Sequence, residues 1–380
     1  MIFDYDTLKL ITWLLVGVLL ISFAIMDGFD MGVGALLPFL GKTDEERRVI
    51  INSIGATWEG NQVWFVTAAG AIFAAWPIVY AVSFSGFYIA LLLALFALFF
   101  RPVGFDYRSK LKDPRWRSTW DWGLFIGGLV PPLIFGIAFG NLLQGVPFHF
   151  DDELRSFYTG SFWGLLNPFA LLAGVVSLSM LIMHGAVYLQ IRTTDVIHDR
   201  CKKAVQLFGV IFIVSFAIAG VWVAYGIDGF KVISMPALDA FSNPLAKTVE
   251  IAPGAWMTNY ETYSWSMLFP ALAFLGAIIA IFWSKFNAPA LAFIASSMSI
   301  IGVIMTAGMA MFPFLMPSST NPNHSLIVWD SASSYLTLTI IFWASVIFIP
   351  LIIFYTSWVY SVLRGKITVQ HIRDNEHTSY

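Results

Sequence analysis

Acidic and amide side chains inside two apolar segments near the start of the chain have types and spacing that could do chemistry. Asp27 and Asp30 lie in the first segment, and Glu59 lies in the second, next to Asn61 and Gln62. A carboxylate at membrane depth costs about 2.5 kcal/mol or more, and such groups commonly mark ion or proton pathways. Amides beside the acids can hold water. The pattern favours a proton pathway through Glu59, Asp30 and Asp27.

The spacing of these acids from a predicted turn brings them to a similar depth. Thr43 and Glu46 have the form of a helix capping box, so a second helix is expected to begin just after Thr43. Asp27 lies sixteen residues before Thr43, and Glu59 lies sixteen residues after it. With a rise of about 1.5 Å per residue, an antiparallel hairpin places both acids, and Asp30, within one turn of the same depth.

The second helix and Arg101 could support this cluster. Asn52, Glu59 and Gln62 are spaced to share one face of a continuous helix, which could point at the first helix or at a partner subunit. Arg101 could pair with one of the acids, although snorkelling to the cytoplasmic surface is the simpler interpretation. The alternative for the cluster is structural, because neutral or hydrogen-bonded acids would lock the hairpin, and Asp27 beside a glycine could cap a helix break.

These segments belong to a very apolar chain. The sequence has 380 residues, of which 58% are hydrophobic, 17% aromatic and only 12% charged, with a formal net charge of −2. This composition predicts an all-α polytopic membrane protein that forms one integral-membrane domain over residues 1–380. Nine transmembrane helices are expected at about residues 10–40, 44–75, 78–100, 120–143, 161–189, 204–225, 264–283, 289–312 and 335–362.

Basic residues predict the orientation of these helices. Most of the 21 Lys and Arg residues fall in alternate loops and in the tail after the last span. Basic residues concentrate on the cytoplasmic side of membrane proteins. We therefore expect a periplasmic N-terminus and a cytoplasmic C-terminus. The loops are compatible with two four-helix bundles plus one extra helix.

Other residues that could bind a metal or a cofactor give weaker signals. His184 could be a haem ligand, but a packing role is favoured because no second axial ligand stands out. The single cysteine, Cys201, excludes an internal disulfide, and its basic neighbours predict a solvated loop. There is no zinc-type spacing and no nucleotide-binding loop, so we expect no metal site in this chain and no nucleic-acid partner.

Six segments of the sequence together resemble one known family, subunit II of the cytochrome bd-type quinol oxidases. The segments are residues 27–34, 58–64, 84–88, 100–108, 139–148 and 312–319. The similarity covers nearly the whole chain in order, and motifs of this length are highly specific. A membrane transporter is the alternative from another class, since glycines interrupt the first span and prolines the end of the eighth.

The resemblance implies an electrogenic enzyme of the bacterial inner membrane that oxidises a quinol and reduces dioxygen to water. In that family subunit I carries the b-type and d-type haems, and subunit II ligates none. A small single-span third subunit, membrane lipid and a quinone are further partners, and some members hold a structural quinone. The resemblance also implies a proton route beginning at Glu59 and an oxygen-access route near Trp64. Many relatives have histidine where this chain has Thr57, so a relay role for that histidine does not carry over.

Overall fold

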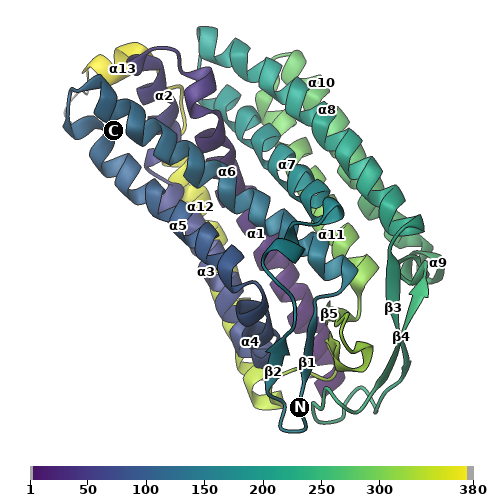
Figure 1. Cartoon of the computed structure of the whole chain (residues 1–380). Helices are drawn as coiled ribbons and strands as arrows, with labels where there is room; N and C mark the ends of the chain where they lie inside the picture. Colours follow the sequence, from purple (N-terminus) through teal and green to yellow (C-terminus); the bar gives the residue numbers. More distant parts are fainter. Residues whose placement is uncertain (1–2, 375–380) are drawn as a thin grey trace.

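The computed structural model describes residues 3–374, and its architecture is a bundle of long helices that run side by side (Figure 1). The α-helices are α1 (Tyr5–Leu40), α2 (Asp44–Gly55), α3 (Trp58–Ala75), α4 (Pro77–Gly86), α5 (Tyr88–Tyr107), α6 (Pro114–Gln144), α7 (Pro168–Arg192), α8 (Asp195–Tyr225), α9 (Thr258–Thr262), α10 (Leu268–Lys285), α11 (Pro289–Met311), α12 (Tyr335–Val362) and α13 (Val369–Asp374). Short 3-10 helices are η1 (Arg108–Lys110), η2 (Trp163–Leu166), η3 (Ala255–Met257), η4 (Ser264–Met267) and η5 (Pro322–His324).

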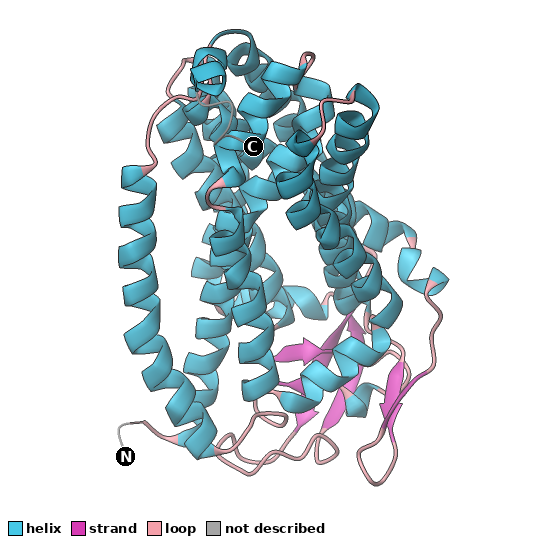
Figure 2. Ribbon diagram, turned by 90° about the vertical axis from the view of Figure 1, so that its left-hand side faces the viewer, coloured by secondary structure: helices cyan, strands magenta, loops and turns pink. Residues whose placement is uncertain are grey.

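Three antiparallel strand pairs lie at one end of the bundle (Figure 2). They pair β1 (Phe148–Phe150) with β2 (Ser156–Tyr158), β3 (Asp228–Ser234) with β4 (Thr248–Pro253), and β5 (Phe314–Met316) with β6 (Leu326–Ile327). The segment 226–262, between two of the predicted spans, contains the β3–β4 pair, η3 and α9.

The polytopic helical class is confirmed. Eight helices of the described chain are long and apolar enough to cross a membrane, and they include α1, α5, α6, α7, α8, α10, α11 and α12. The predicted span 44–75 corresponds to α2 and α3 and is not among the eight. Its apolar part begins only after Glu59, Asn61 and Gln62, which lower the hydropathy of α3. The count of nine spans stays a prediction.

The helices pack in two groups. In the first group α1 packs against α3 and α6, and α5 packs against α6. Helices α7, α8, α10 and α11 form the second group, and α12 lies against α1 and α3. The four-plus-four arrangement stays a prediction, because α7 also packs extensively against α1 and α6. The start of α1 and the short helix α13 lie at opposite ends of the bundle (Figure 1). Their orientation in the membrane stays a prediction.

Two predicted helices are wrong as continuous elements. The helix expected over 44–75 stops at Gly55 and restarts at Trp58, and the helix expected over 78–100 is divided near Phe87. Glycine is a poor helix former and Thr57 is β-branched, so the chain near residue 56 has weak local preference for a continuous helix. Tertiary packing then decides, because Trp58 stacks on Phe105 with ring centroids 5.0 Å apart.

The capping signals agree with the structure. The Thr43 hydroxyl accepts from the Glu46 amide at 3.2 Å, and the Glu46 carboxylate accepts from the Thr43 amide at 3.3 Å, so the capping box is confirmed. Asp113 caps α6 by accepting from the Arg115 amide at 2.8 Å. Because this cap lies before residue 120, α6 begins earlier than the predicted span.

Two more predicted boundaries are wrong. The span predicted over 161–189 begins only at α7, because Asn167 caps that helix by accepting from the Ala170 amide at 2.8 Å. The span predicted from residue 204 begins earlier, at the start of α8, so Cys201 lies inside a helix and is fully buried rather than in a solvated loop.

Candidate functional site

Close helix crossings position the two aspartates of α1. This helix runs unbroken through residues 27–34, so the predicted interruption is wrong. The glycines instead allow a close approach by another helix, since a Cβ added at Gly32 would lie 2.1 Å from the Leu181 carbonyl oxygen of α7. A Cβ added at Gly128 of α6 would lie 2.4 Å from the Met31 carbonyl oxygen. Side chains on α1 near these crossings are therefore enclosed by α6 and α7.

Asp27 forms a buried ion pair with Arg101 of α5. The two guanidinium nitrogens donate to the two carboxylate oxygens at 2.6 and 3.1 Å. Asp27 is 0% exposed and Arg101 is 3% exposed, so the snorkelling interpretation of Arg101 is wrong. The guanidinium also lies 5.4 Å from the centre of the Trp58 ring, which adds a cation–π contact. Bidentate pairing with arginine fixes the Asp27 carboxylate in place.

Asp30 is held by a neutral amide. Its Oδ2 accepts from the Asn61 side-chain amide of α3 at 2.7 Å, and both residues are buried. The same amide lies 2.8 Å from the Tyr360 hydroxyl of α12, and that hydroxyl donates to Asn61 Oδ1 at 2.9 Å. Asp30 Oδ1 has no hydrogen-bond partner among residues 3–374. An oxygen left in this state at such depth is suited to accept a proton or a water molecule.

A small void beside this carboxylate has room for water. It measures about 10 Å³, and both Asp30 and Arg101 contribute to its wall. A volume of this size holds roughly one water molecule. Asp30 and Arg101, the partner of Asp27, therefore face one small space, and Asp27 itself does not line it.

The break between α2 and α3 separates the other predicted polar residues. Glu59 is exposed on the outer face of α3, together with Val63 at 54% and Val66 at 65%. Gln62 is half-buried, and the Asn52 amide donates back to the Arg48 carbonyl of α2 at 2.8 Å. The prediction that Asn52, Glu59 and Gln62 share one face assumed a continuous helix, and the break between α2 and α3 removes that assumption. The structure brings Asp27, Asp30, Asn61 and Arg101 together, and it leaves Glu59 on an apolar outer surface.

The remaining two candidates are packed side chains. Trp64 is 7% exposed and lies in a buried cluster with Leu19, Phe23, Met31, Ala68 and Leu98. His184 has both ring nitrogens occupied, by the Ser296 hydroxyl at 2.7 Å and by the Ile25 carbonyl at 3.0 Å. As placed, this imidazole has no nitrogen free for iron, which agrees with the packing interpretation.

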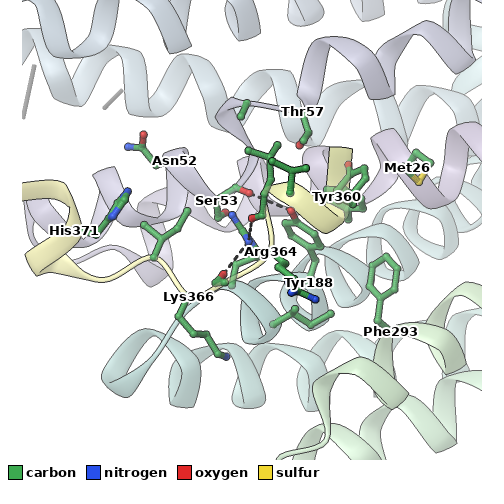
Figure 3. A pocket seen from close by; sticks show the side chains of 18 residues that line it. Met26, Asn52, Ser53, Thr57, Tyr188, Phe293, Tyr360, Arg364, Lys366 and His371 are labelled. Atoms are coloured by element: carbon green, nitrogen blue, oxygen red, sulfur yellow. Dashed lines mark hydrogen bonds between the residues drawn. The ribbon is translucent and has the colours of Figure 1, made fainter. Parts of the chain in front are cut away.

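Sequence reasoning missed Tyr360 and the cavity next to it. The cavity measures about 590 Å³ and lies between the α2–α3 break, the ends of α7 and α12, and the segment that follows α12 (Figure 3). Its wall includes Thr57, Tyr188, Phe293 and Tyr360. One tyrosine near the end of an apolar helix gives no local signal that distinguishes it from the other aromatic residues. Its partner Asn61 is 299 positions away in the sequence.

The chain is similar to known proteins along almost its full length. Residues 8–363 match the family model described as cytochrome bd terminal oxidase subunit II. The chain is 54% identical to cytochrome bd-I ubiquinol oxidase subunit 2 of Escherichia coli (strain K12), over 99% of this chain and 100% of that protein. It is 53% identical to a probable cytochrome oxidase subunit 2 of Haemophilus influenzae, with the same coverage of each chain.

More distant proteins share the same fold. Cytochrome bd ubiquinol oxidase subunit 2 of Bacillus subtilis is 31% identical over 94% of this chain and 96% of its own length. A chain in the structure of bd oxidase from Geobacillus thermodenitrificans superposes with a TM-score of 0.71. That match covers 94% of this chain and 98% of the other at 15% identity, so it shows the fold alone.

Proposed function

Because the chain belongs to the cytochrome bd terminal oxidase subunit II family, we propose that it conducts protons to the haem-bearing partner subunit of a quinol oxidase. The chain is a multi-pass protein of the bacterial inner membrane and a component of an oxidoreductase. The oxidase oxidises a quinol and reduces dioxygen to water, and uptake of protons from one side makes the reaction electrogenic. The haem chemistry takes place in the partner.

One observation carries the proposal, namely that Asp30 is enclosed without a cation of its own. Its Oδ2 accepts a hydrogen bond from Asn61, and its Oδ1 has no partner within the described chain. Neither contact fixes the charge of the carboxylate, so Asp30 can bind and release a proton. Asp27 differs, because the Arg101 guanidinium donates to both of its carboxylate oxygens. We assign Asp27 and Arg101 to fixing the local charge and geometry rather than to proton transfer.

Glu59 lies apart from the buried Asp30 cluster. It is exposed on an apolar face of α3 in the isolated chain, and an exposed carboxylate between valines is costly against lipid. Contact with the partner subunit would cover it. We propose that this face meets the haem-bearing subunit, and that Glu59 exchanges protons at the contact.

The transporter alternative loses its support. It depended on interruptions in the first span and at the end of the eighth. Helix α1 is unbroken from Tyr5 to Leu40, and α11 ends at Met311, before the prolines. The family match also covers nearly the whole chain.

The remaining parts of the complex belong to the same proposal. We expect b-type and d-type haems in the partner, a structural quinone, a small third subunit, and oxygen access past Trp64. Visible absorption spectra test for the haems, and solvent extraction tests for the quinone. Mass spectrometry of the purified complex tests for the third subunit. The oxygen dependence of turnover in Trp64→Ala tests for oxygen access past this residue.

Substitution of the acids tests the proton role. Asp30→Asn and Glu59→Gln should each slow oxygen reduction and formation of the membrane potential by about tenfold or more, since a positioned proton carrier contributes at least that much. The haem content per complex should stay unchanged. Wild-type oxygen reduction and potential in both variants would remove the proton role. Loss of haem with normal turnover per remaining haem would show a scaffold instead.

A further inference from the structure

A cavity reaches the hydrogen-bond network of Asp30 from the end of the bundle that carries α13. It encloses about 590 Å³, which is room for many water molecules. Exposed residues such as Ala56 and Lys366 line it on one side, and Phe29 and Tyr360 line it on the other. Figure 3 shows Lys366 and His371 toward one end of this space and Met26, Phe293 and Tyr360 toward the other.

Polar side chains stand in a mostly apolar cavity wall and can hold water. The side chains of Asn52, Ser53, Thr57 and Tyr360 contribute to the wall, whereas the Tyr188 hydroxyl there already donates to the Ser53 carbonyl. A water molecule needs two to four polar partners, and this wall supplies them along the path from the outer end to the inner end. Thr57 stands at the α2–α3 break and lines the same cavity as Tyr360. The break in the helix therefore forms part of the cavity wall.

Cationic side chains hold the outer wall in place. Arg192 donates to the carbonyls of Leu363 and Gly365 at 2.5 and 2.8 Å. Lys366 donates to the carbonyls of Gln190 and Thr193 at 2.7 and 2.9 Å. These contacts fix the segment after α12 against the end of α7, so the cavity has a defined mouth.

At the inner end, Tyr360 stands between the cavity and Asp30. Asp30 Oδ2 and the Tyr360 hydroxyl contact the same Asn61 nitrogen, at 2.7 and 2.8 Å. Two oxygens that share one nitrogen are close enough for a single water molecule to bridge them. Asn61 itself holds both groups and does not have to carry the proton.

We propose that protons reach Asp30 from this cavity through the Tyr360 hydroxyl, by a route that does not pass Glu59. In each transfer the hydroxyl turns from Asn61 Oδ1 and gives its proton to the bridging water. It takes a proton from a cavity water, and that water is reprotonated from solvent at the mouth of the cavity. The bridging water passes a proton to the Asp30 carboxylate, which becomes a neutral acid, while Tyr360 ends unchanged. This inference rests on the proposed proton role of Asp30 and adds its source.

Removal of one hydroxyl tests the route, with a matched control in the same cavity. Tyr360→Phe should slow turnover about tenfold and increase the solvent deuterium isotope effect, at unchanged haem content. Tyr188→Phe removes a hydroxyl from the same wall, but that hydroxyl donates to the Ser53 carbonyl at 3.1 Å. The Tyr188→Phe variant should therefore turn over at nearly the wild-type rate, with an unchanged solvent deuterium isotope effect.

Plugging the cavity after assembly provides a second measurement that does not depend on folding of a Tyr360 variant. Ala56→Cys places a thiol in the exposed part of the wall, and the native Cys201 is fully buried. A bulky maleimide on this thiol should slow turnover to a similar degree. The same label on Lys42→Cys, at an exposed position outside the cavity, should not. Labelling of the parent complex corrects for cysteines in other subunits.

The outcomes separate this inference from the proposed function. Slow turnover in Asp30→Asn together with wild-type turnover and isotope effect in Tyr360→Phe would overturn the cavity route and leave the proton role of Asp30. Wild-type turnover after plugging would overturn it as well. Wild-type turnover in Asp30→Asn itself would remove the proposed function.

Discussion

Asp27 and Asp30 lie one helical turn apart on α1, are equally buried, and have opposite surroundings. Asp27 meets both nitrogens of the Arg101 guanidinium. Asp30 meets the neutral amide of Asn61 and keeps one oxygen without a partner in residues 3–374. A buried ion pair fixes the charge of its acid, because protonation would leave the cation uncompensated. A neutral hydrogen bond permits both protonation states.

Burial of an acid in the membrane domain does not by itself make that acid a proton carrier. The same segment of α1 supplies one acid for structure and one acid for exchange, and the partner side chain decides between them. Three variants test this division, beginning with the one that should have the largest effect.

Arg101→Gln should have the largest effect. It leaves Asp27 as a buried charge without a partner, which costs about 3–5 kcal/mol. The expected result is a lower thermal unfolding midpoint of the purified complex and less assembled complex in the membrane. The double variant Arg101→Gln with Asp27→Asn removes both charges and should recover most of the lost stability. A double variant no more stable than Arg101→Gln would contradict the assignment of Asp27 to structure.

Asn61→Ala should have an intermediate effect on stability and a clear effect on turnover. It removes the hydrogen bond to Asp30 and leaves buried polar groups unsatisfied, at a cost of about 1–3 kcal/mol. Asn141→Ala is the matched control, because this buried amide donates to the Ile137 and Leu165 carbonyls at 2.8 Å, far from Asp30 in the fold. Both variants should lose stability, and Asn61→Ala alone should slow turnover per haem. Equal slowing in both would mean that stability, not the link to Asp30, limits turnover.

Gln62→Ala should have the smallest effect. Gln62 follows Asn61 on α3 but is half-buried, and its side chain does not take part in the bonds that join Asp30, Asn61 and Tyr360. A substitution of this kind usually changes stability by no more than about 0.5 kcal/mol. Oxygen consumption and the thermal midpoint should both match those of the wild type. Slowing comparable to that of Asn61→Ala would show that the polar character of α3, rather than its contact with Asp30, supports turnover.

The sequence alone was sufficient for the class of protein, the family resemblance and most residues of the site. Polar side chains in an apolar segment stand out locally, which is why Asp27, Asp30, Asn61 and Arg101 could be selected. Helix caps at Thr43 and Asp113 were predictable for the same reason, since a cap depends on residues within three positions. The helix break at residue 56 was missed because its local preference is weak and the packing of Trp58 decides it.

Only the tertiary structure decided which groups meet. Arg101 is 74 residues from Asp27 in the sequence and pairs with that acid rather than with Asp30. Tyr360 is 299 residues from its hydrogen-bond partner Asn61. No local pattern encodes contacts at such separations, because they depend on how helices cross. The close passage of α6 and α7 over the glycines of α1 sets those crossings, and thereby separates an acid that holds its charge from an acid that can exchange it.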